Sequence, residues 1–194
     1  MSSVATETRG FVFGSDLGYM ALAWTEDRLS RLTFGRVTAA AAVADLEASA
    51  GVCCFSSAND LPAWIAKLVE QLQAYAAGDA VVFGKVPLDQ AHLTRFGQEI
   101  IAACRAIPRG NVRTYAQLAA SAGSPGAARA VGNVMAQNRF PIIVPCHRVV
   151  GSSGSLGGFS APDGITMKRR MLTMEGAMEE RIVRPVRREK FALA

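Results

Sequence analysis

The chain has 194 residues, of which half are hydrophobic and 19% are charged, a composition typical of folded proteins and not of disordered ones. This length is enough for one large domain or two small ones. No apolar run approaches the roughly 18 residues that a membrane-spanning helix needs, and the N-terminal MSSVATETRG lacks the basic start and apolar stretch of a secretion signal. We therefore expect a cytoplasmic protein without a membrane partner.

The formal net charge of +5 is distributed unevenly along the chain. Residues 1–90 carry six Lys and Arg against ten Asp and Glu, whereas residues 91–194 carry fifteen against six. Seventeen of the 21 basic residues are arginine, whose planar guanidinium suits phosphate groups. The asymmetry favours a polyanionic partner for the second half, with a merely solvated basic face as the alternative.

The first part of the chain has the pattern of a small α/β unit. Residues 19–25 and 29–34 are apolar runs that flank Glu26-Asp27-Arg28, which predicts a β-hairpin. The alanine-rich segment 38–48 predicts a helix, and the Val-Cys-Cys-Phe segment at 52–55 predicts a buried strand. These residues indicate a fold but no particular chemistry.

The next segment, residues 61–77, predicts an amphipathic helix with Trp64, Leu68 and Leu72 on one face. This spacing is more typical of core packing than of a binding platform. Residues 83–92 follow as the candidate linker between the first and second parts of the chain.

The four cysteines form neither a disulfide framework nor a metal-binding pattern. Cys104 continues the helical apolar face that starts at Phe96, so we expect it in the core. A zinc site formed by Cys53 and Cys54 with His92 would lack paired ligand spacing. We therefore expect reduced thiols and no bound metal.

The second part opens with a helix predicted over residues 93–106. Residues 115–122 and 126–137 predict two further helices separated by a Gly-Ser-Pro turn, the pattern of a helix-turn-helix. We expect Ser124 to be the N-cap of the second of these helices, with Pro125 at its first helical position.

This second helix is crowded with glycine and alanine. Such a narrow helix can approach another backbone closely, whether that of a neighbouring helix or that of a nucleic acid. Arg129 is the one basic residue within 126–137, and its presence favours nucleic acid, including entry into the minor groove.

Residues 140–150, FPIIVPCHRVV, contain the one adjacent Cys-His pair of the chain, Cys146 and His147. A thiol reacts as the thiolate, and a pKa of about 8.5 leaves only a few per cent of it ionised at neutral pH. Neighbours in an extended segment point to opposite sides, so direct contact between the two would need a turn or a bridging water. The dipeptide alone is compatible with a structural cysteine as well as with a nucleophile.

The surrounding residues, however, resemble a known family. PCHRVV at 145–150, preceded by ARAVGNVMAQN at 128–138, resembles the O6-alkylguanine-DNA alkyltransferases, also called methylated-DNA–protein-cysteine methyltransferases. The strong part of the resemblance covers about residues 92–177. It includes GSSGSLGGFS at 151–160, Lys168, Leu172 and Glu175-Gly176.

The resemblance implies an architecture and a partner. The architecture is an α/β N-terminal domain, ribonuclease H-like, over residues 1–88, and a mostly α-helical catalytic domain with a DNA-binding helix-turn-helix over residues 89–180. A basic tail over residues 181–194 follows, with five Lys and Arg. The implied partner is double-stranded DNA bearing O6-alkylguanine, bound by a monomer. No cofactor is implied, because the DNA itself is the alkyl donor.

The implied activity is single-use DNA repair. The target nucleotide is flipped out, and its alkyl group is transferred irreversibly to Cys146, because a thioether does not hydrolyse back to a thiol. Activity on O4-alkylthymine is left open. His147 and Glu175 match the relay that activates the thiol through a water, and Asn138 matches the residue that braces the turn before the active-site strand.

The remaining implied roles concern the base and the DNA. Tyr115 and Arg129 match the pair that rotates the nucleotide out, and Tyr115 is also the implied donor to the base N3. Ser160 lies beside O6, and the carbonyls of Cys146 and Val149 accept from the exocyclic amine. The implied pocket walls are Met135, Pro141 and Phe159. The further implied DNA contacts are Thr114, Ala127, Ala128, Gly132 and Asn133.

The sequence also departs from the commonest family pattern. Phe159 stands where many members have tyrosine, Arg139 where proline is frequent, and residues 161–164 where a glycine pair is usual. These departures bear on the width of the pocket and its tolerance for larger alkyl groups. The Gly/Ser-rich residues 151–158 are interpreted as a pocket-closing loop, since no GK[ST] follows them.

Two other classes of protein stand as alternatives. A non-catalytic reader of alkylated DNA would have the acceptor cysteine replaced, whereas Cys146 is present here. A Cys-His hydrolase without a DNA partner would turn over repeatedly on esters or amides.

Overall fold

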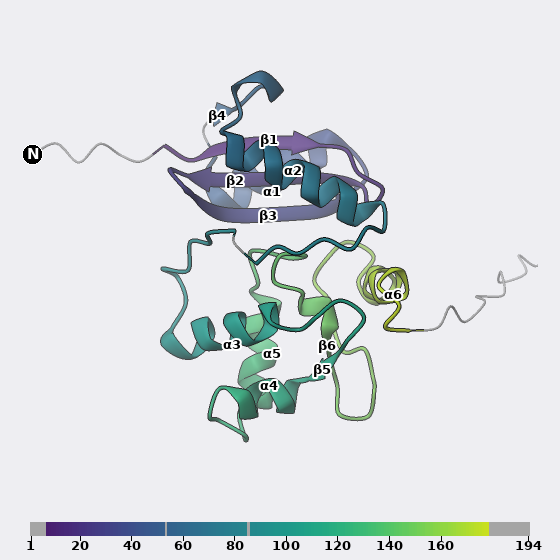
Figure 1. Ribbon diagram of the computed structural model, residues 1–194. Coiled ribbons are helices and arrows are strands. Elements are labelled where there is room, and N and C mark those ends of the chain that lie inside the picture. Colours follow the sequence, from purple (N-terminus) through teal and green to yellow (C-terminus); the bar gives the residue numbers. More distant parts are fainter. Residues whose placement is uncertain (1–6, 53, 85, 179–194) are drawn as a thin grey trace, which may run out of the picture.

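The computed structural model describes residues 7–52, 54–84 and 86–178, arranged as a sheet layer above a mostly helical layer (Figure 1). The sheet layer is built by the first part of the chain and the helical layer by the second. This is the fold class expected from the sequence. The basic tail at 181–194 and Cys53 lie outside the described residues.

A four-stranded sheet forms the first layer, in the order β3-β2-β1-β4. The strands are β1 (Arg9–Phe13), β2 (Tyr19–Thr25), β3 (Arg28–Arg36) and β4 (Cys54–Phe55). The predicted hairpin is confirmed as the antiparallel pair β2–β3. Strand β1 was not predicted; it pairs antiparallel with β2 and parallel with β4.

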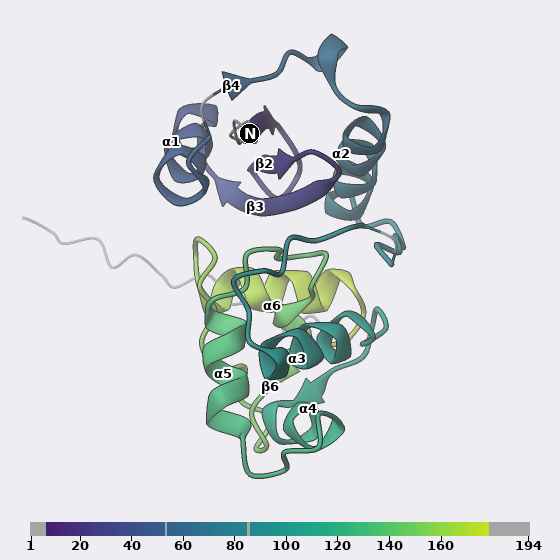
Figure 2. The same ribbon diagram turned by 90° about the vertical axis from the view of Figure 1, so that its left-hand side faces the viewer.

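Two helices cover the two faces of this sheet (Figure 2): α1 (Ala39–Ala50) and α2 (Ala63–Ala76). Successive side chains of β2 point to opposite faces, as in any strand. Ala21 and Ala23 pack with Leu46 of α1, whereas Leu22 and Trp24 belong to the larger core that includes α2. Small side chains on one face and large ones on the other therefore set how closely each helix approaches.

The described part of the segment 52–55, which has two adjacent cysteines, is less buried than the sequence predicts. Cys54 and Phe55 are extended, but they form the short edge strand β4 and the Phe55 side chain is 40% exposed. An edge strand has a neighbour on one side only, which leaves the apolar Phe55 partly in solvent. A short 3-10 helix, Ala58–Asp60, then leads to α2.

The second layer contains four α-helices within the described residues. They are α3 (Arg95–Arg105), α4 (Tyr115–Ser121), α5 (Ala128–Ala136) and α6 (Ile165–Met174). A two-stranded parallel sheet joins β5 (Arg113–Thr114) to β6 (Val149–Val150), and the 3-10 turn η2 (Cys146–Arg148) precedes β6. Cys104 is fully buried on α3, as predicted from its spacing.

Helices α4 and α5 form the predicted helix-turn-helix, with one correction at its turn. Thr114 caps α4 in a reciprocal capping box with Gln117. Ser124 is not the N-cap of α5: that position is Ala127, whose amide donates to the Ser124 carbonyl at 2.9 Å. Pro125 therefore occupies the second position of a β-turn, which its fixed φ suits as well as a first helical turn.

The two layers share one hydrophobic core. At the edge of the sheet, β3 contacts both the linker and the second layer: Leu29 bridges to Leu88 of the linker, and the Leu32 amide donates to the Arg139 carbonyl at 2.9 Å. The domain boundary at residues 88 and 89 stays a prediction. None of the helices described is long and apolar enough to span a bilayer.

Candidate functional site

The chain enters the site through a turn that Asn138 holds. The Asn138 side-chain amide donates to the Val144 carbonyl at 3.0 Å, and its oxygen accepts from the Phe140 amide at 3.0 Å. Ile142, inside this turn, has a φ of 72°, a conformation that β-branched residues rarely adopt. Side-chain bonds at both ends of the turn help to offset that strain, and Asn138 thereby sets the path of the backbone into Cys146.

Cys146 and His147 lie in the 3-10 turn η2 and not in an extended segment. The extended backbone assumed from the sequence is therefore wrong. Both side chains of this turn are buried. The Cys146 residue is 8% exposed and His147 is fully buried. The cysteine lines a cavity, whereas the histidine faces a cluster of polar side chains.

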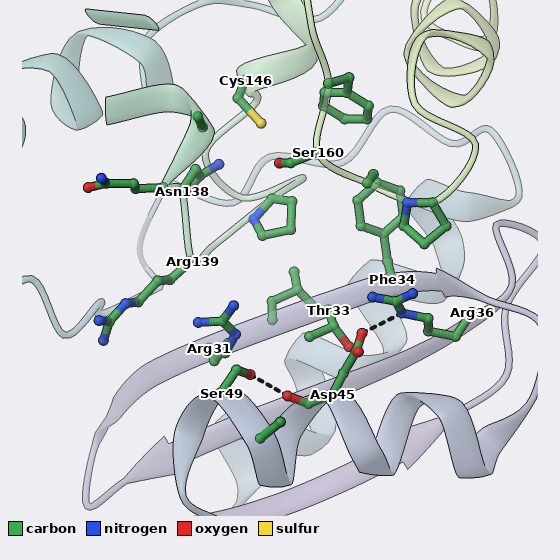
Figure 3. Close-up of a pocket in the computed structure, with 18 of the residues that line it drawn as sticks. Arg31, Thr33, Phe34, Arg36, Asp45, Ser49, Asn138, Arg139, Cys146 and Ser160 are labelled. Atoms are coloured by element: carbon green, nitrogen blue, oxygen red, sulfur yellow. Dashed lines mark hydrogen bonds and ion pairs between the residues drawn. The ribbon is translucent and has the colours of Figure 1, made fainter. Parts of the chain in front are cut away.

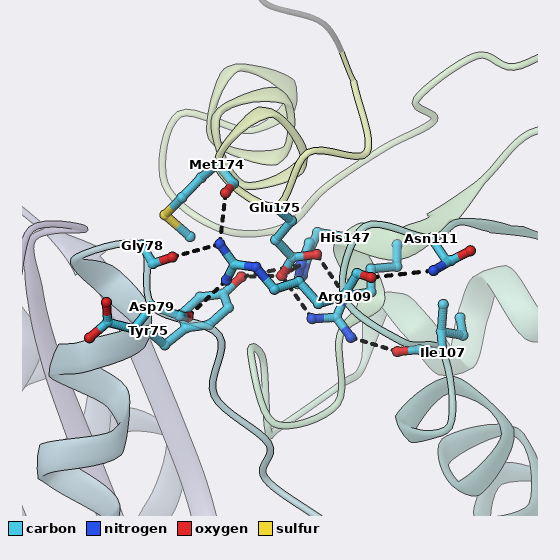
Figure 4. Close-up of polar contacts among 10 residues, drawn as sticks. Tyr75, Gly78, Asp79, Ile107, Arg109, Asn111, His147, Met174 and Glu175 are labelled. Carbon is cyan, nitrogen blue, oxygen red and sulfur yellow. Dashed lines mark hydrogen bonds and ion pairs between the residues drawn. The ribbon is translucent and has the colours of Figure 1, made fainter.

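This cluster is centred on the buried carboxylate of Glu175, at the end of α6 (Figure 4). Nε2 of His147 lies 2.9 Å from Glu175 Oε1. Arg148 donates two bonds of 2.8 Å, from Nε to Oε2 and from Nη2 to Oε1. Tyr75 of α2 donates its hydroxyl to Oε1 at 2.7 Å and lies 3.3 Å from His147 Nε2. The carboxylate is thus held by three side chains from two separate parts of the chain, α2 and η2.

The pKa values follow from this burial and these bonds. Burial alone would raise the pKa of Glu175, but hydrogen bonds from His147 and Arg148 hold it well below its usual range. Burial lowers the pKa of His147, a shift that Glu175 only partly reverses. At neutral pH we therefore assign an ionised Glu175 beside a neutral imidazole.

The tautomer of His147 follows from the same contacts. Since Nε2 faces an ionised carboxylate oxygen, we assign the proton to Nε2, which donates to Glu175. Nδ1 then carries no proton and has a free lone pair. This atom is buried with no hydrogen-bond partner among the residues that the structure describes. Such a nitrogen is suited to accept a proton.

The neighbours of the Cys146 thiol shift its pKa in opposite directions. Burial raises its pKa, while hydrogen bonding by the Asn138 side chain and the charge of Lys168 lower it in part. Lys168 is fully buried, donates from Nζ to the Val149 carbonyl at 2.6 Å, and stands 5.9 Å from the centre of the Phe159 ring. Burial lowers the pKa of Lys168 to about 8, so its charge is titratable near physiological pH.

Cys146 opens into a cavity of about 520 Å³, which we name the acceptor cavity, and this volume is in the range of small-molecule sites. Five of the residues predicted from the sequence to touch the substrate or the DNA are brought together with the cysteine here. The lining residues are Tyr115, Gly132, Met135, Ala136, Cys146, Gly157, Gly158, Phe159 and Ser160. The lining of this mostly apolar cavity therefore includes two residues with hydroxyl groups and one thiol.

The predicted loop 151–158 closes one side of the acceptor cavity. Gly157 has a φ of 68°, and a Cβ there would lie 3.2 Å from the Tyr115 hydroxyl oxygen. A side chain at this position would crowd Tyr115. Glycine thus lets the loop pass close to the tyrosine without displacing it.

Two predicted substrate contacts lie elsewhere. Pro141 lines a second cavity, of about 510 Å³, which also reaches Cys146. Val149 is buried in β6, and its carbonyl already accepts from Lys168. A carbonyl has a second lone pair, so Val149 retains one acceptor position.

The predicted DNA contacts gather on α5 and around the start of α4. Residues three or four apart share a helix face, so Arg129, Gly132, Asn133 and Ala136 form one side of α5. Arg129 and Asn133 are exposed, and Gly132 and Ala136 line the acceptor cavity. Ala127 and Ala128 precede this face, and Thr114 caps α4. The exposed arginine is therefore one helical turn from the mouth of the cavity.

Tyr75, Arg148 and Lys168 were not assigned a role in the site from the sequence. Tyr75 continues the apolar face of α2, so its spacing predicts a core residue and gives no sign that its hydroxyl has a polar role. The one available signal is general: a buried tyrosine hydroxyl needs a polar partner. Arg148 adjoins His147 in the sequence, but nothing local indicates that it pairs with Glu175. Among the residues that the structure describes, no group of His, Cys, Asp and Glu could hold a metal ion.

Comparisons with known proteins agree with this geometry. A family model for the DNA-binding domain of 6-O-methylguanine DNA methyltransferase matches residues 95–177. The methylated-DNA–protein-cysteine methyltransferase of Methanothermobacter thermautotrophicus is 35% identical over 130 residues, which cover 67% of this chain and 72% of that protein. The protein of the same name from Mycobacterium bovis is 47% identical over 107 residues, covering 55% of this chain and 62% of that protein.

A solved structure extends the likeness to the whole fold. The crystal structure of Mycobacterium tuberculosis OGT in complex with DNA superposes with a TM-score of 0.68 at 35% identity. The superposition covers 87% of this chain and 93% of that one. The likeness therefore includes the sheet layer as well as the helical layer.

Tyr75→Phe removes one donor from the buried Glu175 carboxylate. We expect the free energy of unfolding to fall by about 1.5–3 kcal/mol, the range for a hydrogen bond to a charged group. Denaturant titration monitored by fluorescence measures it. Tyr19→Phe, at a partly exposed tyrosine, is the matched control and should change stability by less than about 0.5 kcal/mol. Equal effects of the two substitutions would contradict the bond.

Lys168→Met removes the cation that lowers the pKa of Cys146. Lys168 is protonated below a pH of about 8, so its support of the thiolate is present there and fades at higher pH. We expect Cys146 to react with iodoacetamide about tenfold more slowly in the variant at pH 7, equivalent to about one pKa unit of thiolate stabilisation, and the difference to shrink by pH 9.5.

Peptide-resolved mass spectrometry measures this rate at Cys146, and Lys168→Arg, which keeps the charge, is the control. A rate ratio between native protein and Lys168→Met that stays constant from pH 7 to pH 9.5 would refute the role of the lysine charge.

Proposed function

The chain belongs to the family of methylated-DNA–protein-cysteine methyltransferases, and we propose that it flips an O6-alkylguanine out of duplex DNA and takes the alkyl group on Cys146. DNA repair by alkyl transfer is the activity of the family. The observation that carries the assignment to this residue is the position of the Cys146 sulfur, in a cavity bounded by the helix-turn-helix and by two hydroxyl groups. The chain acts as a monomer in this proposal.

The reaction is a displacement at the alkyl carbon. The thiol proton passes to Nδ1 of His147 through a water, and Glu175 stabilises the imidazolium that forms. The sulfur then forms a bond to the carbon while the carbon–O6 bond breaks, and the electron pair leaves with guanine. The product on Cys146 is a thioether, which has no hydrolytic route back to a thiol, so each molecule acts once.

Guanine is a poor leaving group unless its developing negative charge is met by donors. Tyr115 and Ser160 carry hydroxyl groups on the wall of the acceptor cavity, and we propose that Tyr115 donates to N3 and Ser160 to O6. Met135 and Phe159 provide the apolar walls against which the base stacks. The carbonyls of Cys146 and Val149 accept from the exocyclic amine and so favour guanine over adenine.

The target base lies inside the duplex, and its removal from the stack costs a few kcal/mol. We propose that Arg129 enters the vacated stack while Tyr115 turns the nucleotide toward the cavity. Small residues on α5 and its start allow the helix to approach the minor groove closely. The contacts proposed on this surface are Thr114, Ala127, Ala128, Gly132 and Asn133.

Cys146→Ser should abolish alkyl transfer while duplex binding is retained. Intact-mass measurement after incubation with a duplex containing O6-methylguanine should show one methyl group per native molecule and none on the variant. Methylation of another residue would refute the assignment, and repeated turnover of substrate would indicate a hydrolase. Binding of methylated duplex without any mass gain by the native protein would indicate a non-catalytic reader. The same titration with O4-methylthymine tests the second substrate.

Arg129→Ala should slow repair of the duplex by about tenfold or more, corresponding to about 1.4 kcal/mol of the cost of eversion. Its rate with free O6-benzylguanine should be unchanged, since a free base needs no eversion. Arg169→Ala, at an exposed arginine of α6, is the matched control for loss of charge. Equal losses on duplex and free base would remove the role of Arg129 in flipping.

A further inference from the structure

The second cavity lies between the two layers and meets the acceptor cavity at the reactive sulfur. It is bounded by β3 and α1 on one side and by residues 137–141 and 159–162 on the other (Figure 3). Cys146 and Ser160 lie at one end of it, and Asp45 and Ser49 of α1 at the other. Ala136, Cys146, Phe159 and Ser160 line both cavities. A substituent that extends past the sulfur therefore has room to enter this second space.

This second cavity, which we name the arginine cavity, carries excess positive charge. Three arginines line it, Arg31, Arg36 and Arg139, against one carboxylate, Asp45. Asp45 is already engaged, because it forms an ion pair with Arg36. Within the described part of the chain, neither Arg31 nor Arg139 forms an ion pair. Two guanidinium groups are thus left without an anionic partner.

Two polar atoms on β3 also lack partners. Nε of Arg31 and Oγ1 of Thr33 are buried without a hydrogen bond to any described residue. Residues i and i+2 of a strand share a face, so both side chains leave β3 toward the arginine cavity that they line. Buried donors without partners are costly, and an anion seated between them would satisfy both.

The pKa values show that these charges act on one another. Burial lowers the pKa of Arg31, and repulsion by Arg139 lowers it further, while Asp45 opposes this. Burial likewise lowers the pKa of His92, which also lines the cavity, and Arg139 and Arg31 add to the effect. Like charges held together in a partly buried space repel. An anion in the cavity would relieve that repulsion.

We propose that the arginine cavity binds the carboxylate end of a long O6-carboxyalkyl substituent while the first carbon of that substituent stands at the Cys146 sulfur. This proposal rests on the proposed function and names a substrate class for it: guanine carrying an extended, anion-terminated adduct. The carboxylate takes no part in bond breaking. The sulfur–carbon bond forms, the carbon–O6 bond breaks, guanine leaves with the electron pair, and the carboxyalkyl chain stays on Cys146.

The arginine cavity has both apolar and charged lining residues. Pro141 and Phe159 line the arginine cavity, and Phe159 also lines the acceptor cavity. Arg31 and Arg139 lie farther from Cys146 than Ser160 does (Figure 3). A methylene chain suits the apolar residues of this lining and a carboxylate suits the arginines. A neutral chain of equal length would gain the apolar contacts alone.

The test compares single-turnover rates of the full chain on duplexes that carry O6-methylguanine, a series of O6-carboxyalkylguanines from propyl to hexyl, and the neutral alkyl adducts of equal length. We expect at least one carboxyalkyl adduct to react about tenfold faster than its neutral partner. In Arg31→Gln and Arg139→Gln this preference should fall about tenfold, while the rate on O6-methylguanine stays within about twofold. Arg169→Gln is the control for loss of a charge outside the cavity.

Each outcome has a distinct meaning. Equal rates on charged and neutral adducts at every length, with O6-methylguanine still repaired, would overturn the carboxylate subsite and leave the proposed function standing. Slowing of all duplex substrates alike by Arg31→Gln or Arg139→Gln would assign the arginines to a DNA phosphate and overturn the proposal. Absence of transfer from O6-methylguanine would overturn the proposed function itself. Arg31→Lys, which keeps the charge, should retain the preference if Arg31→Gln fails to fold.

Discussion

The site is organised by one buried anion, the carboxylate of Glu175. A buried charge is tolerated only where partners replace its water, and removing one such partner is more costly than the bond alone suggests. Here Arg148 supplies two donors and Tyr75 and His147 one each. Because Arg148 and His147 belong to the same 3-10 turn as Cys146, satisfying the carboxylate also fixes the turn that carries the sulfur. Stability and reactivity therefore depend on the same contacts.

This arrangement gives the sheet layer a part in the site. Tyr75 reaches Glu175 from α2, and Arg109 joins the same region by donating to the carbonyls of Gly78 and Asp79 and to that of Met174. The end of α2 and the end of α6 are thereby held against the turn of Cys146. The first layer is thus a support for the turn that carries Cys146, although none of its described residues lines the acceptor cavity.

The sequence predicted those parts of the protein that depend on neighbours along the chain. Among the described elements, helices α1 to α5 and the β2–β3 hairpin follow from local composition and spacing, whereas α6 was not predicted. The PCHRV segment is specific enough to indicate the chemistry proposed for Cys146 and His147. Strand β1 was missed because RGFVF is short and its place depends on pairing with β2 and β4. The prediction of Ser124 as the N-cap of α5 was wrong, because Pro125 is equally suited to a turn and to the start of a helix. Tyr75 was missed because its partner lies 100 residues away.

Under the proposed function, the electrostatics of Cys146 explain how a single-use nucleophile survives until it meets its substrate. Burial keeps the thiol largely protonated, so it is a weak target for small oxidants and electrophiles in solution. The charge of Lys168, which is present at pH 7, only partly offsets this effect of burial. His147, the nearby base, is buried and neutral. A base in the acceptor cavity changes this balance by placing an electrophilic carbon against the sulfur and excluding water from it, which strengthens every charge interaction nearby. Reactivity is then confined to the bound state, as an irreversible acceptor requires.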